Sequence, residues 1–202
     1  TRPKKSAKAY KKIWWKEGSP LIVLSQRLFE KVKKFINIPV ALAMRYGSIS
    51  INKGIKELYE SGVNEIVVLP LYPHYAMSSY ETVVEKVKDE VKNNFPGVNL
   101  KIVSPFYKER NYINLLSNKI KETINKIKYD HILFSYHGIP VSHLKISDPT
   151  NSHCYKVNNC CSTKSDAHKY CYRHQVLETT EAVVKKLKID KDKYSNAFQS
   201  RL

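Results

Sequence analysis

The sequence predicts an α/β fold, in which strands and helices alternate along most of the 202 residues. Three observations predict it: short apolar runs bounded by turn residues, longer stretches with apolar residues at helical spacing, and the regular alternation of the two. The hydrophobic content of 42% is enough for a core, and the length allows one large domain or two small ones. No apolar run approaches about 18 residues, so we expect no membrane-spanning helix.

The first half begins with a helix and continues with alternating strands and helices. Apolar residues recur at helical spacing over 20–35, which starts with a favourable Ser-Pro pair. The apolar run 39–44 predicts a strand. A helix over 51–60 is closed by Gly62, and 65–71 has the composition of a second buried strand.

The same alternation continues toward the middle of the chain. Residues 80–95 are amphipathic and predict a helix, and 100–104 predict a third strand. Isoleucine and leucine at helical spacing predict a helix over 111–128. The short apolar and aromatic run 131–136 predicts a buried strand.

The last third is less regular. Residues 141–170 lack clean periodicity, a helix is expected over 175–187, and 195–202 resemble a strand. Because the chain begins at Thr1 rather than Met and ends in this strand-like run, we expect it to be a fragment of a longer protein.

The chain is strongly basic, with a net charge of +17 and a pI near 9.6. Such a charge favours anionic partners, and a nucleic-acid-binding module is one alternative that it raises. The lysines, however, are spread over all the predicted helices and form no tract, which favours solvated faces. No glycine-rich phosphate loop is present, so no nucleotide cofactor is indicated.

His137 ends the predicted strand 131–136, and Gly138 and Pro140 stop that strand directly afterwards. In open α/β sheets, ligands bind just outside the carboxyl ends of strands. His137 is therefore a candidate for proton or metal chemistry, although a single histidine at a strand end can also be purely structural.

All four cysteines of the chain follow within a short, irregular stretch, with the spacing C-x5-C-C-x9-C. No secretory signal is evident, so metal binding is favoured over disulfides. Structural zinc usually uses C-x2–4-C pairs, which the adjacent pair fits poorly, whereas thiolates also hold iron–sulfur clusters. An iron–sulfur cluster, zinc, and free or redox-active thiols all stay open. The residues are Cys154, Cys160, Cys161 and Cys171.

Six segments together resemble the ferrochelatases, the enzymes that insert ferrous iron into a porphyrin. They occur in the order found in that family and extend over nearly the whole chain. The segments are 13–21 (IWWKEGSPL), 44–47 (MRYG), 69–75 (LPLYPHY), 134–140 (FSYHGIP), 171–173 (CYR) and 198–201 (FQSR).

The resemblance implies a chelatase-like fold: two Rossmann-like (flavodoxin-like) domains with parallel sheets that face a cleft, the second truncated here. Residues 1–129 would form the first domain, with its N-terminal strand missing. Residues 130–202 would begin the second domain and include the cysteine-rich segment.

The implied activity is that of a lyase of haem biosynthesis, which forms metal–nitrogen bonds in protoporphyrin IX or coproporphyrin III. His137 matches the catalytic histidine of the family. A neutral imidazole can remove pyrrole protons and can bind a borderline metal such as Fe²⁺, the metal substrate. The catalytic glutamate of the family would lie beyond Leu202. Alternatives are a cobalt- or nickel-type chelatase of the same fold and a non-enzymatic iron–sulfur or zinc-binding protein.

The resemblance also assigns residues that line the cleft. Arg45, Tyr46 and Tyr72 match such positions, although the sequence after Gly47 departs from the usual Asn-Pro of the family. His74 stands where some members have a histidine that contacts a second, outer metal ion, and a plain surface histidine is an equal alternative.

A group of bacterial ferrochelatases has cysteines in the segment that corresponds to 154–171 and is thought to bind a [2Fe-2S] cluster there. The resemblance therefore implies that Cys154, Cys160, Cys161 and Cys171 hold such a cluster. The expected partners are porphyrin and ferrous iron, with no nucleic acid. The expected location is cytoplasmic, with peripheral contact to the anionic inner membrane. The sequence does not indicate an oligomeric state.

Overall fold

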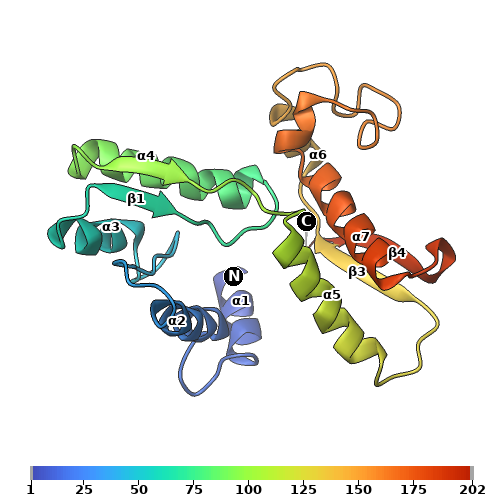
Figure 1. Cartoon of the computed structure of the whole chain (residues 1–202), viewed down its shortest axis with the longest axis horizontal. Coiled ribbons are helices and arrows are strands. Elements are labelled where there is room, and N and C mark those ends of the chain that lie inside the picture. Colours follow the sequence, from blue (N-terminus) through green and yellow to red (C-terminus); the bar gives the residue numbers. More distant parts are fainter. Residues whose placement is uncertain (1, 201–202) are drawn as a thin grey trace. The chain divides into compact units, whose positions relative to one another are not determined.

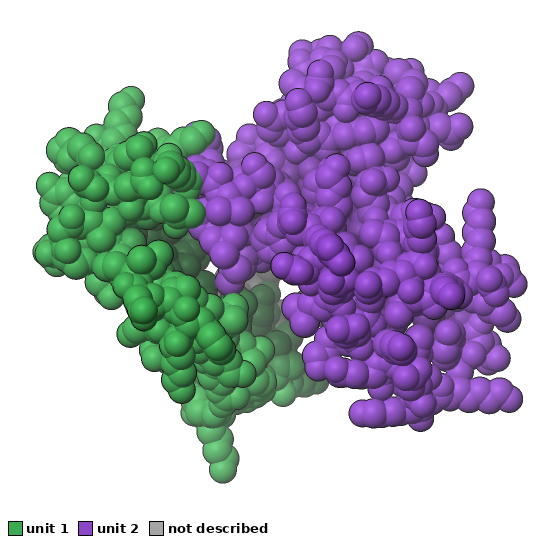
Figure 2. Space-filling view, in the orientation of Figure 1, with its two compact units in different colours: residues 1–67, 86–101 green, residues 68–85, 102–202 purple. Residues whose placement is uncertain are grey.

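A computed structural model describes residues 2–200 (Figure 1), so Arg201 of the last motif lies outside the described residues. The chain has an α/β architecture, as predicted. It divides into two compact units, which are coloured separately in Figure 2. The first comprises 1–67 and 86–101, and the second comprises 68–85 and 102–202. No helix of residues 2–200 is long and apolar enough to cross a membrane.

The first unit contains most of the predicted elements of the N-terminal half. The helix α1 at its start was not predicted, because its apolar residues are too few to give a helical pattern. Its elements are α1 (Arg2–Lys11), α2 (Pro20–Lys33), α3 (Ile51–Glu60), β1 (Glu65–Val68), most of α4 (Thr82–Asn94) and β2 (Asn99–Ile102). β1 and β2 form a two-stranded sheet. The Asn99 amide donates to the Asn64 carbonyl at 2.8 Å.

Two expectations about strands in this unit are wrong. Residues 39–44 form only an isolated bridge, between Met44 and Ser50, and no other ladder in the described part of the chain includes them. This segment packs against α3 instead, where a Cβ added at Gly54 would lie 3.2 Å from the Ala43 Cβ. The strand expected over 65–71 ends at Val68. It is not buried on both faces, because Val67 is 60% exposed.

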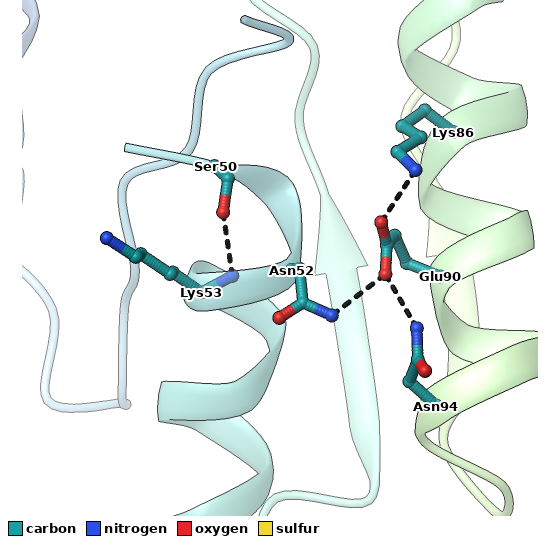
Figure 3. Close-up of polar contacts among 6 residues, drawn as sticks. All are labelled: Ser50, Asn52, Lys53, Lys86, Glu90 and Asn94. Atoms are coloured by element: carbon teal, nitrogen blue, oxygen red, sulfur yellow. Dashed lines mark hydrogen bonds and ion pairs between the residues drawn. The ribbon is translucent and has the colours of Figure 1, made fainter. Parts of the chain in front are cut away.

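A polar network connects α3 to α4 (Figure 3). The Glu90 carboxylate accepts from the Lys86 ammonium at 2.7 Å, and from the side-chain amides of Asn52 and Asn94 at 2.8 Å each. These donors, Lys86 first and then Asn52, lower the pKa of Glu90. At the start of α3, the Ser50 hydroxyl accepts the Lys53 amide, which satisfies one of the free amides of the first turn.

The second unit contains the candidate sites. The predicted helix over 175–187 and the last strand are both present, and the irregular stretch 141–170 contains only two short helices. Its elements are a short π-helix (Met77–Glu81), α5 (Arg110–Ile124), β3 (Ile132–His137), α6 (Val141–Ile146), a 3₁₀ helix (Asp166–Tyr170), α7 (Tyr172–Leu187), a second 3₁₀ helix (Lys191–Lys193) and β4 (Tyr194–Gln199).

α7 is the most deeply buried helix of this unit. β3 and β4 run parallel, with His137 opposite Gln199, and α7 packs against α5 (Figure 1). On α7, Val176 and Val183 are 0% and 1% exposed. Such apolar burial stabilises a domain by roughly 1.5–3 kcal/mol per side chain, so α7 fixes the strand that ends in His137.

Candidate functional site

His137 is the last residue of β3, as the sequence predicted, and its side chain is exposed. Side-chain exposure alternates along β3. His137 therefore lies on the more exposed face of this strand, together with Leu133, which is 61% exposed. The next amide, of Gly138, donates to the Gln199 carbonyl at 2.8 Å. A Cβ at Gly138 would lie 3.4 Å from the Ser200 Cβ. Glycine therefore allows the segments that follow β3 and β4 to stay close together.

The opposite face of β3 is covered by α7. The hydroxyls of Tyr136 and Thr180 are 2.7 Å apart, and the Thr180 hydroxyl is 2.8 Å from the Asn196 side-chain oxygen. That oxygen can only accept, so Thr180 donates to it and Tyr136 donates to Thr180. Side chains alternate between faces along a strand, so His137 points away from this covered side.

His74 lies on the covered side. Its ring meets the rings of Tyr136 and Tyr172 edge-on, at centroid distances of 6.1 and 5.9 Å. Its Nε2 is 2.9 Å from the Thr179 hydroxyl, which is 2.7 Å from the Tyr107 carbonyl. Thr179 donates to that carbonyl, so Nε2 carries the hydrogen and donates to Thr179.

Burial lowers the pKa of His74 to about 4, so its ring is neutral near pH 7. His74 and His137 therefore lie on opposite faces of β3, and the structure does not bring them together. A metal contact at His74 stays a prediction, and it would have to use Nδ1.

Gln175 is a buried residue of this region that the sequence did not single out. Its side-chain oxygen accepts the Tyr75 amide at 2.7 Å, and its side-chain nitrogen donates to the Lys169 carbonyl at 2.9 Å. It thereby ties the loop that contains His74 to the 3₁₀ helix next to Cys171. The only signal in the sequence is a polar residue at an inward position of a helix.

The other predicted cleft residues are distributed over both units. Arg45 lies 4.7 Å above the ring of Tyr46, which is 75% exposed, and both belong to the first unit. Tyr72 and His137 belong to the second unit, where Tyr72 is 39% exposed. Each unit is described by itself, so a cleft lined by these residues stays a prediction.

The four cysteines are free thiols, and Cys171 lies at the centre of the group. Cys171 packs with Cys154 and Leu144 in one buried cluster. The neighbouring thiol of Cys161 also acts on its ionisation. Cys171 is the N-cap of α7, where its sulfur accepts the His174 amide at 3.4 Å.

These contacts concentrate negative charge on Cys171. The thiol of Cys161, followed by the backbone amides at the start of α7, lowers the pKa of Cys171 to about 6. The same interaction, together with burial, raises the pKa of Cys161 far above its usual range. Burial raises the pKa of Cys154 to about 11. Of these three thiols, Cys171 is therefore the most acidic.

A buried carboxylate orders the first part of the cysteine segment. Asp148 accepts the amides of Thr150, His153 and Cys154 at 2.9, 2.9 and 2.8 Å. Burial alone would raise the pKa of Asp148, but these donors and the Thr150 hydroxyl outweigh it and hold the pKa well below its usual range.

Three imidazoles hold the middle of the segment. His153 and His168 each place Nε2 against the Cys160 carbonyl, at 2.7 and 2.8 Å, and His174 places Nδ1 2.8 Å from the Cys161 carbonyl. A carbonyl only accepts, so each of these nitrogens carries a hydrogen. His168 and His174 are stacked, with centroids 3.6 Å apart. These nitrogens therefore support the cysteine backbone and are not free to bind a metal.

The thiols suit a soft metal group in donor type and in their clustering. Within residues 2–200, however, no three or more His, Cys, Asp or Glu side chains converge on one point as the ligands of a single metal ion do. A two-iron cluster binds its thiolates as two separate pairs, one on each iron, and so needs no common point. The donor type alone leaves the kind of metal group open, so a [2Fe-2S] cluster stays a prediction.

The family model described as Ferrochelatase matches residues 1–202. The chain is 43% identical to the ferrochelatase of Opitutus terrae, 41% to that of Pseudomonas syringae pv. tomato and 41% to that of Coxiella burnetii. All of this chain is matched in each case, against 59%, 59% and 56% of the relative's length. The chain thus spans less than two thirds of the length of these relatives. On this evidence, it belongs to the ferrochelatase family.

Proposed function

We propose that the protein is a ferrochelatase that inserts ferrous iron into protoporphyrin IX or coproporphyrin III during haem biosynthesis. One observation carries the proposal beyond family membership: His137 ends β3 on its open face, where a flat macrocycle could reach the imidazole. We also propose the chelatase division into domains at residues 129 and 130, with Arg45, Tyr46 and Tyr72 lining the cleft between the domains.

The reaction replaces two pyrrole N–H hydrogens with one Fe²⁺ ion and so releases two protons. In this mechanism, the unprotonated ring nitrogen of His137 takes a pyrrole proton and passes it to solvent, which its exposed side chain can reach. The covered face of β3 keeps the strand end rigid, through the contact of Tyr136 with α7. His137 is then ready to accept the second proton.

The test is His137→Ala in the full-length protein, assayed anaerobically for iron insertion. Loss of a general base lowers rates by about 10²- to 10⁴-fold, and a fall of that size is expected with an unchanged circular dichroism spectrum. His131→Ala is the matched control. His131 lies directly before β3 and is also exposed, and its Nε2 lies 3.0 Å from the Ser195 hydroxyl. Near-normal activity of His137→Ala would refute the assignment.

We further propose that Cys154, Cys160, Cys161 and Cys171 hold a [2Fe-2S] cluster, supported by their position in one short segment and by the packing of Cys154 with Cys171. When bound, such a group supplies one-electron redox chemistry, whereas iron insertion moves no electrons. Its role would therefore be structural or sensory. Anaerobically purified protein should be red-brown and contain iron and acid-labile sulfide, and Cys171→Ser should lose both. Colourless protein with one zinc ion would overturn this proposal.

The proposed location is the cytoplasm, with peripheral and salt-sensitive contact to an anionic membrane. The net charge of +17 supports it. Binding to acidic liposomes that is insensitive to ionic strength would contradict it.

A further inference from the structure

Four aromatic side chains pack around one another beneath the end of β3. The ring of His74 meets those of Tyr136 and Tyr172 edge-on, at centroid distances of 6.1 and 5.9 Å. Phe198 of β4, which lies opposite Tyr136 in the strand register, is 6.1 Å from Tyr136 and 6.5 Å from Tyr172. Edge-on and tilted contacts of this kind are favoured between aromatic rings. Tyr136 is therefore supported by two rings, Phe198 from its own sheet and His74 from a loop.

The loop that contains His74 is fastened to α7 by two consecutive residues. The His74 Nε2 donates to the Thr179 hydroxyl at 2.9 Å, and the Tyr75 amide donates to the Gln175 side-chain oxygen at 2.7 Å. Thr179 and Gln175 are both almost completely buried. The ring of His74 cannot turn away from Tyr136 without breaking its hydrogen bond to Thr179, so its position is fixed.

This support acts on the residue next to His137. Tyr136 and His137 are consecutive and lie on opposite faces of β3, so the backbone of His137 follows any displacement of the Tyr136 ring. Removing the His74 ring would leave a cavity beside Tyr136 that the surroundings fill only in part. Misplacing a catalytic group by about 1 Å can lower a rate by about 10²-fold.

We propose that His74 is a positioning residue for His137. Its ring, fixed by Thr179, supports Tyr136 and so holds the imidazole of His137 where it can accept a pyrrole proton. His74 lies on the covered face of β3 and acts through Tyr136 rather than on the substrate. The inference rests on the proposed iron insertion. It requires the ring of His74, whereas the metal contact predicted for this residue would require a ring nitrogen.

Two substitutions in the full-length protein separate these roles. His74→Ala removes the ring. His74→Phe keeps an aromatic ring between Tyr136 and Tyr172 but has no nitrogen, and Thr179 still donates to the Tyr107 carbonyl at 2.7 Å. Iron insertion is measured anaerobically at a temperature where circular dichroism shows each variant to be folded.

For His74→Ala we expect kcat to fall by about 10- to 100-fold. The KM for the porphyrin should change by less than about twofold, because His74 lies on the face of β3 opposite His137. His74→Phe should restore kcat to within about threefold of the wild type, since the support of Tyr136 is kept.

Ile113→Ala is the matched control for a simple loss of packing. Ile113 is a buried residue of α5, 7% exposed, and does not belong to the aromatic group. Its truncation should leave kcat per folded molecule unchanged. A His74→Ala variant with the kcat of the wild type would overturn the proposal. So would a His74→Phe variant as slow as His74→Ala, because the nitrogen would then be what matters.

Hydrogen exchange at the Gly138 amide tests the support of β3 without an assay of activity. This amide donates to the Gln199 carbonyl directly after the strand. Its exchange, followed by NMR, should be about tenfold faster in His74→Ala and should return to the wild-type rate in His74→Phe. An unchanged rate in His74→Ala would overturn the proposal. If this amide responds as expected but His137→Ala keeps its activity, the proposed role of His137 fails and the support of β3 by His74 stands.

Discussion

The end of β3 and the cysteine segment are two regions of one unit that are positioned by different forces. His137 is placed by strand register and by the apolar packing of α7, in which Val176 and Val183 are almost completely buried. The cysteine segment is placed by polar contacts, with Asp148 binding its first amides and three imidazoles binding two carbonyls.

The backbone of the cysteine segment also adopts less favourable conformations. Asn151, Tyr155 and Asn159 have φ values of 53°, 58° and 52°. Asparagine tolerates this left-handed region, but a tyrosine there is strained by about 1–2 kcal/mol. A region stabilised by buried apolar side chains should lose little folding stability when one polar group is removed. A strained region held by a few buried hydrogen bonds should lose much more.

The largest effect is expected for Asp148→Ala. The substitution leaves three backbone amides without their acceptor. A buried amide without a partner lowers the free energy of unfolding by about 1–3 kcal/mol, so we expect a total loss of about 3 kcal/mol or more. Asp192→Ala, at an exposed position, should change stability by less than about 0.5 kcal/mol. Urea unfolding measures both, and equal effects would contradict the comparison.

The same carboxylate gives a pH dependence. The pKa of Asp148 is lower in the folded chain than in the unfolded one, so its contribution to stability is complete above the unfolded carboxyl pKa. That contribution is lost as the pH falls below the unfolded value toward the folded one. In wild-type protein the stability should therefore decrease in acid more steeply than in Asp148→Ala, as acid titration of the unfolding free energy would show.

A smaller effect is expected for Thr180→Val beneath β3. The substitution removes the hydrogen bonds of Thr180 with Tyr136 and Asn196 but keeps the volume of the side chain. We expect a loss of about 1–2 kcal/mol, less than for Asp148→Ala, because the apolar contacts of α7 stay. A loss larger than that of Asp148→Ala would reverse the ranking of the two regions.

The sequence was most informative where one local pattern decides the structure. The apolar run before Gly138 and Pro140 located β3 and placed His137 at its end. The spacing of the cysteines indicated a group of thiols, and the structure packs Cys154 against Cys171 in one buried cluster.

The sequence failed where a role depends on distant partners. His174 and Gln175 are polar residues in a helical context, and their function appears only when backbone groups distant in the sequence meet them. The partners of Asp148 are near in the sequence, but they lie in an irregular segment whose turns no simple pattern predicts. Likewise, the run 39–44 has a strand-like composition, but a strand requires a hydrogen-bonded neighbour, and these residues pack on α3 instead.

The smallest effect is expected at the far end of α7, which supports both regions. Lys188 caps this helix in the left-handed conformation, with φ 55° and ψ 44°. Glycine adopts this conformation without the steric cost of a Cβ, so Lys188→Gly should stabilise the protein by about 1 kcal/mol. Lys188→Ala keeps the Cβ and is the matched control, with no comparable gain expected.

The gain from Lys188→Gly should reach both regions, because α7 begins at the Cys171 cap and binds Tyr136 of β3 through Thr180. Hydrogen exchange should therefore slow at the amides of β3 and at the first amides of α7 by a similar factor, of about fivefold for 1 kcal/mol. Slowing in β3 alone would mean that the cysteine segment opens independently of α7. The polar contacts of Asp148 and the imidazoles would then be its only support.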